Sequence, residues 1–342
     1  MRTNQKIIIF KRFSNVFQKQ YAKITNFDPI TSEKLDESGN KLSKRASFRS
    51  INVDNKLLAY LDSRDLGRET LNKIKMRKSI FIRKGLLDIK DFEKEISVKA
   101  FDVPAWAIKK IHSAQKIEEI PPISDLPEVT FIGRSNVGKS TLLNAILGIM
   151  RKPLVRATIS NKPGETKQLD FFRLGKKSKG QMILVDTPGF GFAHTTNEED
   201  SETFLNTLLA YLRGRGSVLK RVCMLIDSRH GFKRNDIEFL KKLYDNKKSE
   251  GKNPLGAPFK PPKLQIILTK CDLVLRRDLA RRVTKVRNEL NDVIPRETFL
   301  PVLMVSALKE KALADVQREL AGLINTPPRE ETQHESIKPE RK

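Results

Sequence analysis

The sequence predicts a three-layer α/β domain with a mostly parallel central sheet, preceded by an N-terminal extension that is poorly structured or forms short helices. Four apolar runs of strand length each end in a short polar motif; they lie at 129–132, 182–185, 264–268 and 302–305. The first run leads through a glycine-rich loop into an apolar helix at 141–147, an order typical of parallel α/β sheets. Of the 342 residues, 38% are hydrophobic and 31% charged, so part of the chain can bury a core.

The net charge is the unusual feature of the composition. The chain has 66 Lys and Arg against 41 Asp and Glu, a net charge of +25, which favours an anionic partner such as nucleic acid or a charged membrane surface. Its two cysteines and four scattered histidines exclude a disulfide framework and a zinc cluster. No apolar run approaches the ~20 residues of a membrane span. We therefore expect no transmembrane segment, and we expect a monomer.

Composition divides the chain into four segments. Residues 1–27 contain six Lys or Arg, no acid, and Ile and Phe side chains that can share one helix face, which is typical of a mitochondrial transit peptide. A basic nucleic-acid-binding arm and a disordered segment are the alternatives for this stretch. Residues 28–109 are an extension or linker, 110–326 form the α/β domain, and the polar tail 327–342 is expected to be disordered.

The extension shows only weak patterns. Residues 31–50 are rich in Ser, Lys, Asp and Gly and predict a linker. Apolar periodicity predicts short helices at 56–61, 71–82 and 92–98. None of these patterns indicates a chemical activity for the segment.

The glycine-rich loop after the first apolar run has the pattern G-x-x-x-x-G-K-[ST] between a strand and a helix. Glycines let backbone N–H groups surround phosphates, and the helix N-terminus adds a positive dipole. Lys139 would reach the β and γ oxygens, and the Ser140 hydroxyl would ligate Mg²⁺. A plain glycine turn is the alternative, but the flanking strand and helix favour nucleotide binding. The predicted nucleotide-binding residues here are Gly133, Arg134, Ser135, Asn136, Val137, Gly138, Lys139, Ser140 and Thr141.

The second apolar run ends in Asp186-Thr187-Pro188-Gly189. A carboxylate at the end of a strand, downstream of a phosphate-binding loop, suits a residue that holds magnesium through water. The backbone N–H of Gly189 can meet the γ-phosphate. An ordinary turn is the alternative interpretation, which the preceding loop makes the weaker one.

The last two apolar runs are each followed by residues of a base-recognition pattern. The run at 264–268 is followed by Thr269-Lys270-Cys271-Asp272. Asp272 can accept hydrogen bonds from N1–H and the exocyclic amine of guanine, whereas adenine lacks this donor pair. The Lys270 stem can cover the base plane, and Ser306-Ala307, after the last run, can offer a backbone N–H to the guanine O6. In this order the motifs select GTP and GDP over adenine nucleotides.

With these motifs in place, the chain resembles a translation-factor-class GTPase of the EngB/YihA family, within the TrmE–Era–EngA–YihA group. The resemblance covers about 111–324 and predicts a P-loop GTPase domain. Its most selective parts are the Pro-Gly-x-Thr, Gly-Phe-Gly-Phe-Ala and Asp-x-Arg-His elements. The matching stretches are Leu126-Pro127-Glu128-Val129, 133–140, Pro163-Gly164-Glu165-Thr166, Asp186-Thr187-Pro188-Gly189-Phe190-Gly191-Phe192-Ala193, Asp227-Ser228-Arg229-His230, Thr269-Lys270-Cys271-Asp272 and Ser306-Ala307.

The resemblance implies further roles. Thr166 matches the switch threonine that ligates Mg²⁺ when GTP is bound, so the implied metal ligands are Ser140, Thr166 and Asp186. Glu165 stands where Arg or His is common, and Thr187 stands where Leu is frequent; neither touches the phosphate or base contacts. The family acts in GTP-dependent assembly of the large ribosomal subunit. With the predicted transit peptide, we expect a protein of the mitochondrial matrix that acts on the mitochondrial large subunit or supports mitochondrial translation.

Hydrolysis is expected to be slow without a stimulus. The residue after Gly189 is Phe190, which cannot orient water as the glutamine of Ras-like enzymes does. Related GTPases with Asn in the phosphate loop bind K⁺ there, and Asn136 matches that position; a purely structural role for Asn136 is the alternative. K⁺ or the ribosome would then stimulate turnover. The predicted catalytic residues are Asn136, Lys139, Thr166 and Gly189.

Basic clusters in the domain favour contact with rRNA phosphates through shape and charge, because no aromatic RNA-recognition motif is present. By default such clusters are solvated faces. A nucleotide-regulated RNA-binding scaffold with negligible turnover is the alternative function, inside or outside mitochondria. The clusters are Lys176-Lys177-Lys179, Arg213-Arg215-Lys220-Arg221, Lys241-Lys242-Lys247-Lys248 and Arg276-Arg277-Arg281-Arg282-Lys285-Arg287.

Overall fold

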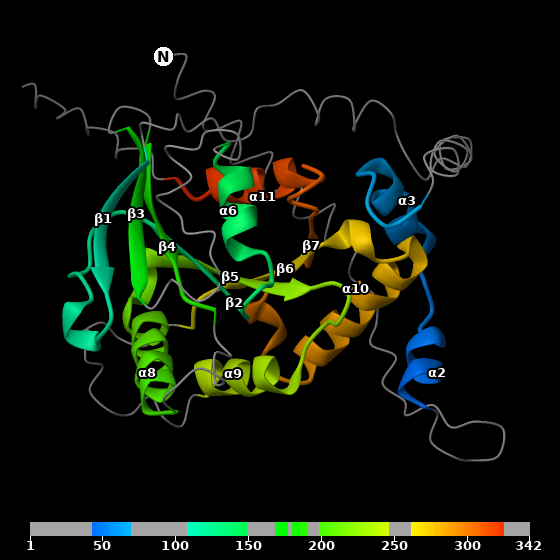
Figure 1. Cartoon of the computed structure of the whole chain (residues 1–342), viewed down its shortest axis with the longest axis horizontal. Helices are drawn as coiled ribbons and strands as arrows, with labels where there is room; N and C mark the ends of the chain where they lie inside the picture. Colours follow the sequence, from blue (N-terminus) through cyan, green and yellow to red (C-terminus); the bar gives the residue numbers. More distant parts are fainter. Residues whose placement is uncertain are drawn as a thin grey trace, which may run out of the picture.

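The computed structural model describes residues 43–69, 108–148, 168–176, 180–189, 198–245 and 261–324. A seven-stranded sheet in the order β1-β3-β4-β2-β5-β6-β7 forms its centre (Figure 1). The strands are β1 Ile108–Ala114, β2 Glu128–Gly133, β3 Leu169–Lys176, β4 Gly180–Asp186, β5 Leu219–Asp227, β6 Leu264–Thr269 and β7 Leu303–Met304.

The sheet is mostly parallel, as the sequence predicts. β2 pairs in parallel with β4 and β5, and β6 pairs in parallel with β5 and β7. The four predicted apolar runs are β2, β4, β6 and β7, and all residues of β2 and β6 are buried. β1 and β3 add an antiparallel edge that the apolar runs did not indicate.

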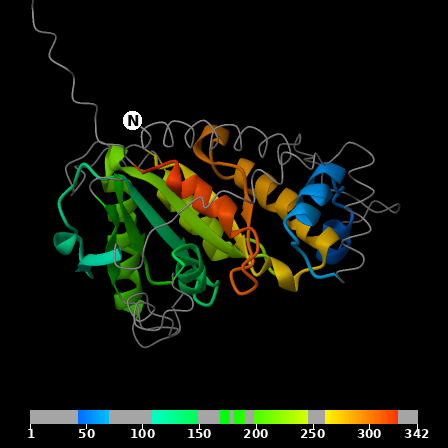
Figure 2. The ribbon, with the colours of Figure 1, turned by 90° about the horizontal axis from the view of Figure 1, so that it is seen from above.

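Helices cover both faces of the sheet and complete three layers. α6 Lys139–Ile146 and α11 Leu313–Ala321 lie on one face, and α8 Glu198–Gly214 and α9 Arg234–Tyr244 lie on the other (Figures 1 and 2). α10 Arg276–Asn291 follows β6 and buries Leu279, Val283, Val286 and Leu290, a stripe at helical spacing. The short 3₁₀ helices are η2 Ile117–Glu119, η4 Gly216–Val218, η6 Cys271–Leu273 and η7 Arg296–Thr298.

The described part of the N-terminal extension is helical and packs against the domain. α3 Asn55–Ser63 contains the helix predicted at 56–61, whereas α2 Lys44–Arg49 lies where a linker was predicted. α2 forms because the Ser43 hydroxyl caps it by accepting from the N–H of Ala46 at 3.2 Å. Both helices contact α10, at the end of the molecule opposite β1 (Figure 1).

The hydrophobic core joins the extension to the sheet. Leu57, Leu61 and Leu66 belong to the same buried cluster as the residues of β2, β4 and β6. The predicted transit peptide 1–27, the helices predicted at 71–82 and 92–98, and the tail 327–342 lie outside the described residues. Within the described ranges, no helix combines the length and apolarity needed to span a bilayer.

Candidate nucleotide-binding site

The predicted phosphate loop, residues 133–140, connects the carboxyl end of β2 to the N-terminus of α6. Gly138, the residue before α6, has a φ of 99°, and Asn136 also adopts the left-handed region at 60°. These two conformations turn the chain tightly enough for α6 to begin at Lys139. The backbone N–H groups of its first turn have no intrahelical acceptor, so they can bind phosphate oxygens.

Lys139 and Asp186 form a buried ion pair beside this loop. Their side chains are 8% and 2% exposed, and Asp186 ends β4 directly opposite Phe131 of β2. Burial raises the pKa of the Asp186 carboxyl, and the ammonium group of Lys139 opposes this shift. The structure therefore places the predicted phosphate-binding lysine and the predicted magnesium carboxylate in direct contact. Ser140 is half-buried one residue further along α6.

The turn after Asp186 lies against the phosphate loop. The Thr187 hydroxyl donates to the carbonyl of Phe131 at 3.0 Å. A Cβ atom on Gly189 would lie 2.6 Å from the backbone nitrogen of Ser135 and 2.8 Å from its Cα. Only glycine permits this approach, which brings Gly189 against the phosphate loop; the contact of its N–H with the γ-phosphate stays a prediction.

The predicted base-recognition residues also come together at this edge of the sheet. The Thr269 hydroxyl, at the end of β6, donates to the Val137 carbonyl at 2.6 Å and so joins the base motif to the phosphate loop. The Ser306 hydroxyl donates to Asp272 at 2.6 Å, and Ala307 is buried beside Ser306. The two segments predicted to read guanine are therefore in contact.

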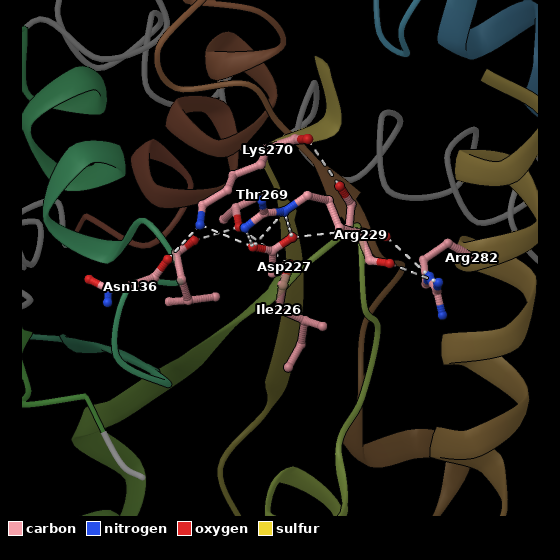
Figure 3. Close-up of polar contacts among 9 residues, drawn as sticks. Asn136, Ile226, Asp227, Arg229, Thr269, Lys270 and Arg282 are labelled. Carbon is pink, nitrogen blue, oxygen red and sulfur yellow. Dashed lines mark hydrogen bonds and ion pairs between the residues drawn. The ribbon is translucent and has the colours of Figure 1, made fainter. Parts of the chain in front are cut away.

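Lys270 bridges three parts of the site (Figure 3). Its backbone adopts a φ of 54°, which is uncommon for a lysine and is held by the surrounding contacts. Its ammonium group donates to the Asn136 carbonyl at 2.5 Å and pairs with Asp227 at 3.0 Å. The Asn136 side chain is exposed and points away from Lys270 (Figure 3).

Asp227 is a site residue to which the sequence reasoning assigned no role. Arg229 binds its carboxylate from the other side, with Nη2 at 2.7 Å from Oδ2 and Nε at 3.0 Å from Oδ1. Burial would raise the pKa of Asp227, but hydrogen bonds from Arg229 and Lys270 outweigh burial and lower it to about 2. The signal that could have found it is its position: it ends the apolar run of β5, as Asp186 ends β4.

A cavity of about 200 Å³ opens between the phosphate loop and the turn that follows β5. Four basic side chains line it, Arg134, Arg229, Lys233 and Lys270, together with the carboxylate of Asp227. Asp236, buried at the start of α9, also lines it; burial raises the pKa of this carboxyl, although the Lys233 N–H and the charge of Arg134 oppose the shift. The cavity extends the site beyond the residues predicted to bind nucleotide.

The prediction that the basic clusters are solvated faces is wrong for four arginines. Arg215 pairs with Glu128, Arg221 with Glu319 at 3.1 Å, and Arg276 with Asp62 at 3.0 Å. Arg287 is also buried. Burial of an arginine requires a partner for its charge, and sequence spacing does not show which acid supplies it. Lys220, Lys241, Lys242 and Arg277 are exposed, as predicted.

Some predicted residues lie outside the described ranges. These are the motif stretches Pro163-Gly164-Glu165-Thr166, with the switch threonine, and Phe190-Gly191-Phe192-Ala193, and the basic residues Lys177, Lys179, Lys247 and Lys248. Their roles remain predictions.

A strand–loop–helix that presents backbone N–H groups, a lysine and carboxylate behind it, and a polar motif after each following parallel strand define a P-loop protein of the GTPase class. Residues 128–255 match a family model described as 50S ribosome-binding GTPase. A probable GTP-binding protein EngB of Rhodospirillum rubrum is 33% identical over 239 residues, which cover 68% of this chain and 93% of that protein. The chain therefore belongs to the EngB family, which confirms the resemblance found in its motifs.

Two further relatives, from Granulibacter bethesdensis and Caulobacter vibrioides, agree with this assignment. The probable GTP-binding protein EngB of Granulibacter bethesdensis is 40% identical over 219 residues, covering 63% of this chain and 84% of that protein. Its counterpart in Caulobacter vibrioides is 37% identical over 235 residues, covering 68% and 90%. The crystal structure of a probable GTP-binding protein EngB aligns with a TM-score of 0.37 at 20% identity, over 57% of this chain and 98% of that chain.

Proposed function

We propose that this protein binds GTP and GDP with Mg²⁺, hydrolyses GTP slowly, and acts on the mitochondrial large ribosomal subunit. One observation carries the nucleotide part of the proposal. The described residues predicted for phosphate, metal and guanine, a set without Thr166, lie together at the carboxyl ends of β2, β4, β6 and β7, and the bond from Thr269 to Val137 joins two of these groups. Ligands of open α/β sheets bind at this edge.

Nucleotide binding would exchange partners within the buried pair. Lys139 would turn from Asp186 to the β and γ phosphate oxygens, which replace one anionic partner by another and so keep the ammonium group neutralised. The N–H of Ser306 already donates to the Lys311 carbonyl at 3.2 Å, which leaves the N–H of Ala307 as the donor to the guanine O6.

The donor set also fits Mg²⁺. Ser140, Asp186 and the predicted Thr166 offer hard oxygen ligands, which this ion prefers. Among the described residues no three His, Cys, Asp or Glu side chains gather at one point to hold a metal. Because Mg²⁺ demands near-octahedral coordination, three side-chain oxygens would leave positions for phosphate oxygens and water. When bound, it would neutralise charge on the phosphates.

Base recognition gives the first test. Asp272→Asn replaces an acceptor by a donor, so we expect preference to move from guanine to xanthine nucleotides. Two charged hydrogen bonds at about 1.5–3 kcal/mol each predict a loss of GDP affinity of roughly 10²–10⁴-fold. Asp278→Asn, which removes a carboxylate from the first turn of α10, is the matched control. Retained guanine preference in Asp272→Asn would refute the assignment.

Measurement of GTP turnover distinguishes a GTPase from a nucleotide-regulated RNA-binding scaffold with negligible turnover. We expect GTP hydrolysis by the full chain to be faster in KCl than in NaCl and faster still with large ribosomal subunits, because Phe190 cannot orient water. Asn136→Ala should remove the difference between the two salts. Equal rates in KCl and NaCl would exclude the K⁺ role. Tight GTP binding with no turnover under any of these conditions would favour the RNA-binding scaffold.

The proposed mitochondrial location depends on residues 1–27. The proposed ribosomal partner depends on the charge of the chain and on its family. The matched family model is described as ribosome-binding, and exposed Lys220, Lys241, Lys242 and Arg277 offer contacts to rRNA phosphates. Sequencing the N-terminus of the mature protein tests the transit peptide; retention of residues 1–27 would contradict import with cleavage. Sedimentation with mitochondrial large subunits in GTP, but not in GDP, tests the partner.

A further inference from the structure

The N-terminal extension contacts the chain directly after the guanine-reading motif. Arg276, the first residue of α10, is only 3% exposed; its guanidinium pairs with Asp62 at 3.0 Å and donates to the Leu58 carbonyl at 2.8 Å. The N–H of Arg68 donates to the Val274 carbonyl at 2.6 Å. These contacts fall on residues two to four positions after Asp272.

The backbones of the two segments touch at Gly67. A Cβ atom on Gly67 would lie 2.8 Å from the Cα of Arg276, and the glycine adopts a φ of 91°. A side chain at this position would therefore push residues 66–68 away from 274–276. The fit is specific to this pair of segments.

The same extension also contacts residues 311–315, which follow Ser306 and Ala307 of the predicted base site. Asp315, in the first turn of α11, accepts from the Tyr60 hydroxyl at 2.6 Å and from Arg64 at 2.9 and 3.0 Å. Asp65 pairs with Lys311 at 3.4 Å. Lys311 in turn exchanges backbone hydrogen bonds with Ser306, the residue that donates to Asp272.

A third contact of the extension supports the turn that follows Asp227, the ion-pair partner of Lys270. The ring of Phe48 in α2 stacks on the Arg282 guanidinium, with 4.6 Å between the ring centre and Cζ. Arg282 donates to the carbonyls of Ser228 and Arg229, which follow Asp227 (Figure 3). This contact supports the turn that presents Asp227 to Lys270.

We infer that residues 55–68, here called the brace, position Asp272 and Ser306 and thereby set the selectivity for guanine. The inference rests on the proposed role of Asp272. One side of the brace binds residues 274–276, and the other side binds residues 311–315. The brace therefore fixes the distance between the two segments that carry Asp272 and Ser306, whose side chains are hydrogen-bonded to each other. The bonds of the brace described above end on residues 274–276 and 311–315 and not on Asp272 or the phosphate loop, so we assign its residues a positioning role.

Binding of the exocyclic amine of guanine distinguishes a displaced Asp272 from a general loss of protein stability. Hypoxanthine in IDP keeps N1–H and O6 but lacks this amine, so the ratio of GDP to IDP affinity measures the contact of Asp272 with the amine. The phosphate loop binds both nucleotides alike. Displacing Asp272 should therefore lower the ratio, whereas a general loss of stability should weaken both nucleotides together.

The test compares two variants of the full chain with a matched control. The double variant Tyr60→Phe/Arg64→Met removes the bonds of the brace to Asp315, and Gly67→Ala separates the brace from Arg276. The control Tyr211→Phe removes a buried hydroxyl that also donates to a carboxylate, Glu128 at 2.8 Å, at the start of β2 and away from the base site. Affinities come from competition against a fluorescent GDP, with melting temperatures measured in parallel.

We expect the GDP-to-IDP ratio to fall roughly threefold to tenfold in both brace variants, as the loss of one hydrogen bond predicts, and to stay at the wild-type value in Tyr211→Phe. An unchanged ratio in folded brace variants overturns the inference. The single variant Tyr60→Phe, which removes one oxygen atom, decides the matter by the same ratio where the other two do not fold. A wild-type protein without preference for GDP over IDP would instead overturn the proposed role of Asp272.

Discussion

Arg215 lies at the centre of a buried polar network, and replacing it by methionine should lower the stability of the domain. Its side chain is 1% exposed and pairs with Glu128, which is fully buried at the start of β2. It also donates to the Pro121 carbonyl at 2.6 Å and stacks on the ring of Tyr211. The arginine thus connects the end of α8 to the strand that leads into the phosphate loop.

The size of the effect follows from what Arg215→Met leaves behind. The Glu128 carboxylate would remain buried with Tyr211 as its donor, and the Pro121 carbonyl would lose its partner. Removing one member of a buried ion pair costs about 3–5 kcal/mol. For a domain of 150–250 residues each kcal/mol lowers the melting temperature by about 2–4 °C, so we expect a decrease of roughly 6–20 °C.

The assay is thermal and urea unfolding of the full chain without added nucleotide, because a bound ligand would shift both midpoints. Lys220→Met is the control, since Lys220 is exposed and the variant loses the same charge; it should change stability by less than about 0.5 kcal/mol. The double variant Glu128→Gln/Arg215→Met should recover part of the loss. An effect of Arg215→Met below about 1 kcal/mol, or one equal to that of Lys220→Met, would refute this reasoning.

Three further predictions concern single residues. Burial raises the pKa of the Cys223 and Cys271 thiols to about 12, so both should resist alkylation at pH 8 until the protein is unfolded; rapid native labelling would contradict this. Gly189→Ala should weaken GTP binding, because its Cβ meets the Ser135 backbone; an unchanged GTP affinity would show that the turn can move. The pKa of Asp227 lies near 2 when folded and about 3.9 when unfolded, so its contribution to stability is complete above about pH 4 and is lost toward pH 2. Asp227→Asn should flatten the fall of the urea midpoint in that window, and equal slopes for the two proteins would disprove the coupling.

The strands that carry the site were predictable because each is a continuous apolar run. β2 and β6 are buried along their whole length, which is typical of parallel strands covered by helices on both faces. β1 was not predictable on this basis, since Lys109, Lys110 and His112 are exposed on this edge strand and its pairing with β3 supplies the order. An edge strand needs little hydrophobicity of its own when a buried neighbour fixes its register.

The site itself was predictable as far as its motifs are local. The phosphate loop and the base motif each occupy one short stretch, whereas the Lys270–Asp227 pair joins β5 to β6 and becomes visible only in the sheet. The brace was beyond the reach of sequence analysis for the same reason. Tyr60 and Asp315 are 255 residues apart in the sequence, and neither belongs to a motif.

The buried ion pairs also determine which charged side chains remain on the surface. Each pair, such as Arg221 with Glu319 or Arg276 with Asp62, removes one positive and one negative side chain from the surface and leaves the net charge unchanged. The whole chain holds 66 Lys or Arg against 41 Asp or Glu, so each internal pair leaves the remaining charged side chains more cationic in proportion than the composition. Buried arginines stabilise the fold through these pairs, whereas exposed residues such as Lys241 and Lys242 would contact the anionic partner proposed above. A polyanion bound by such lysines would be released by salt without loss of the buried pairs, because screening acts mainly on exposed charges.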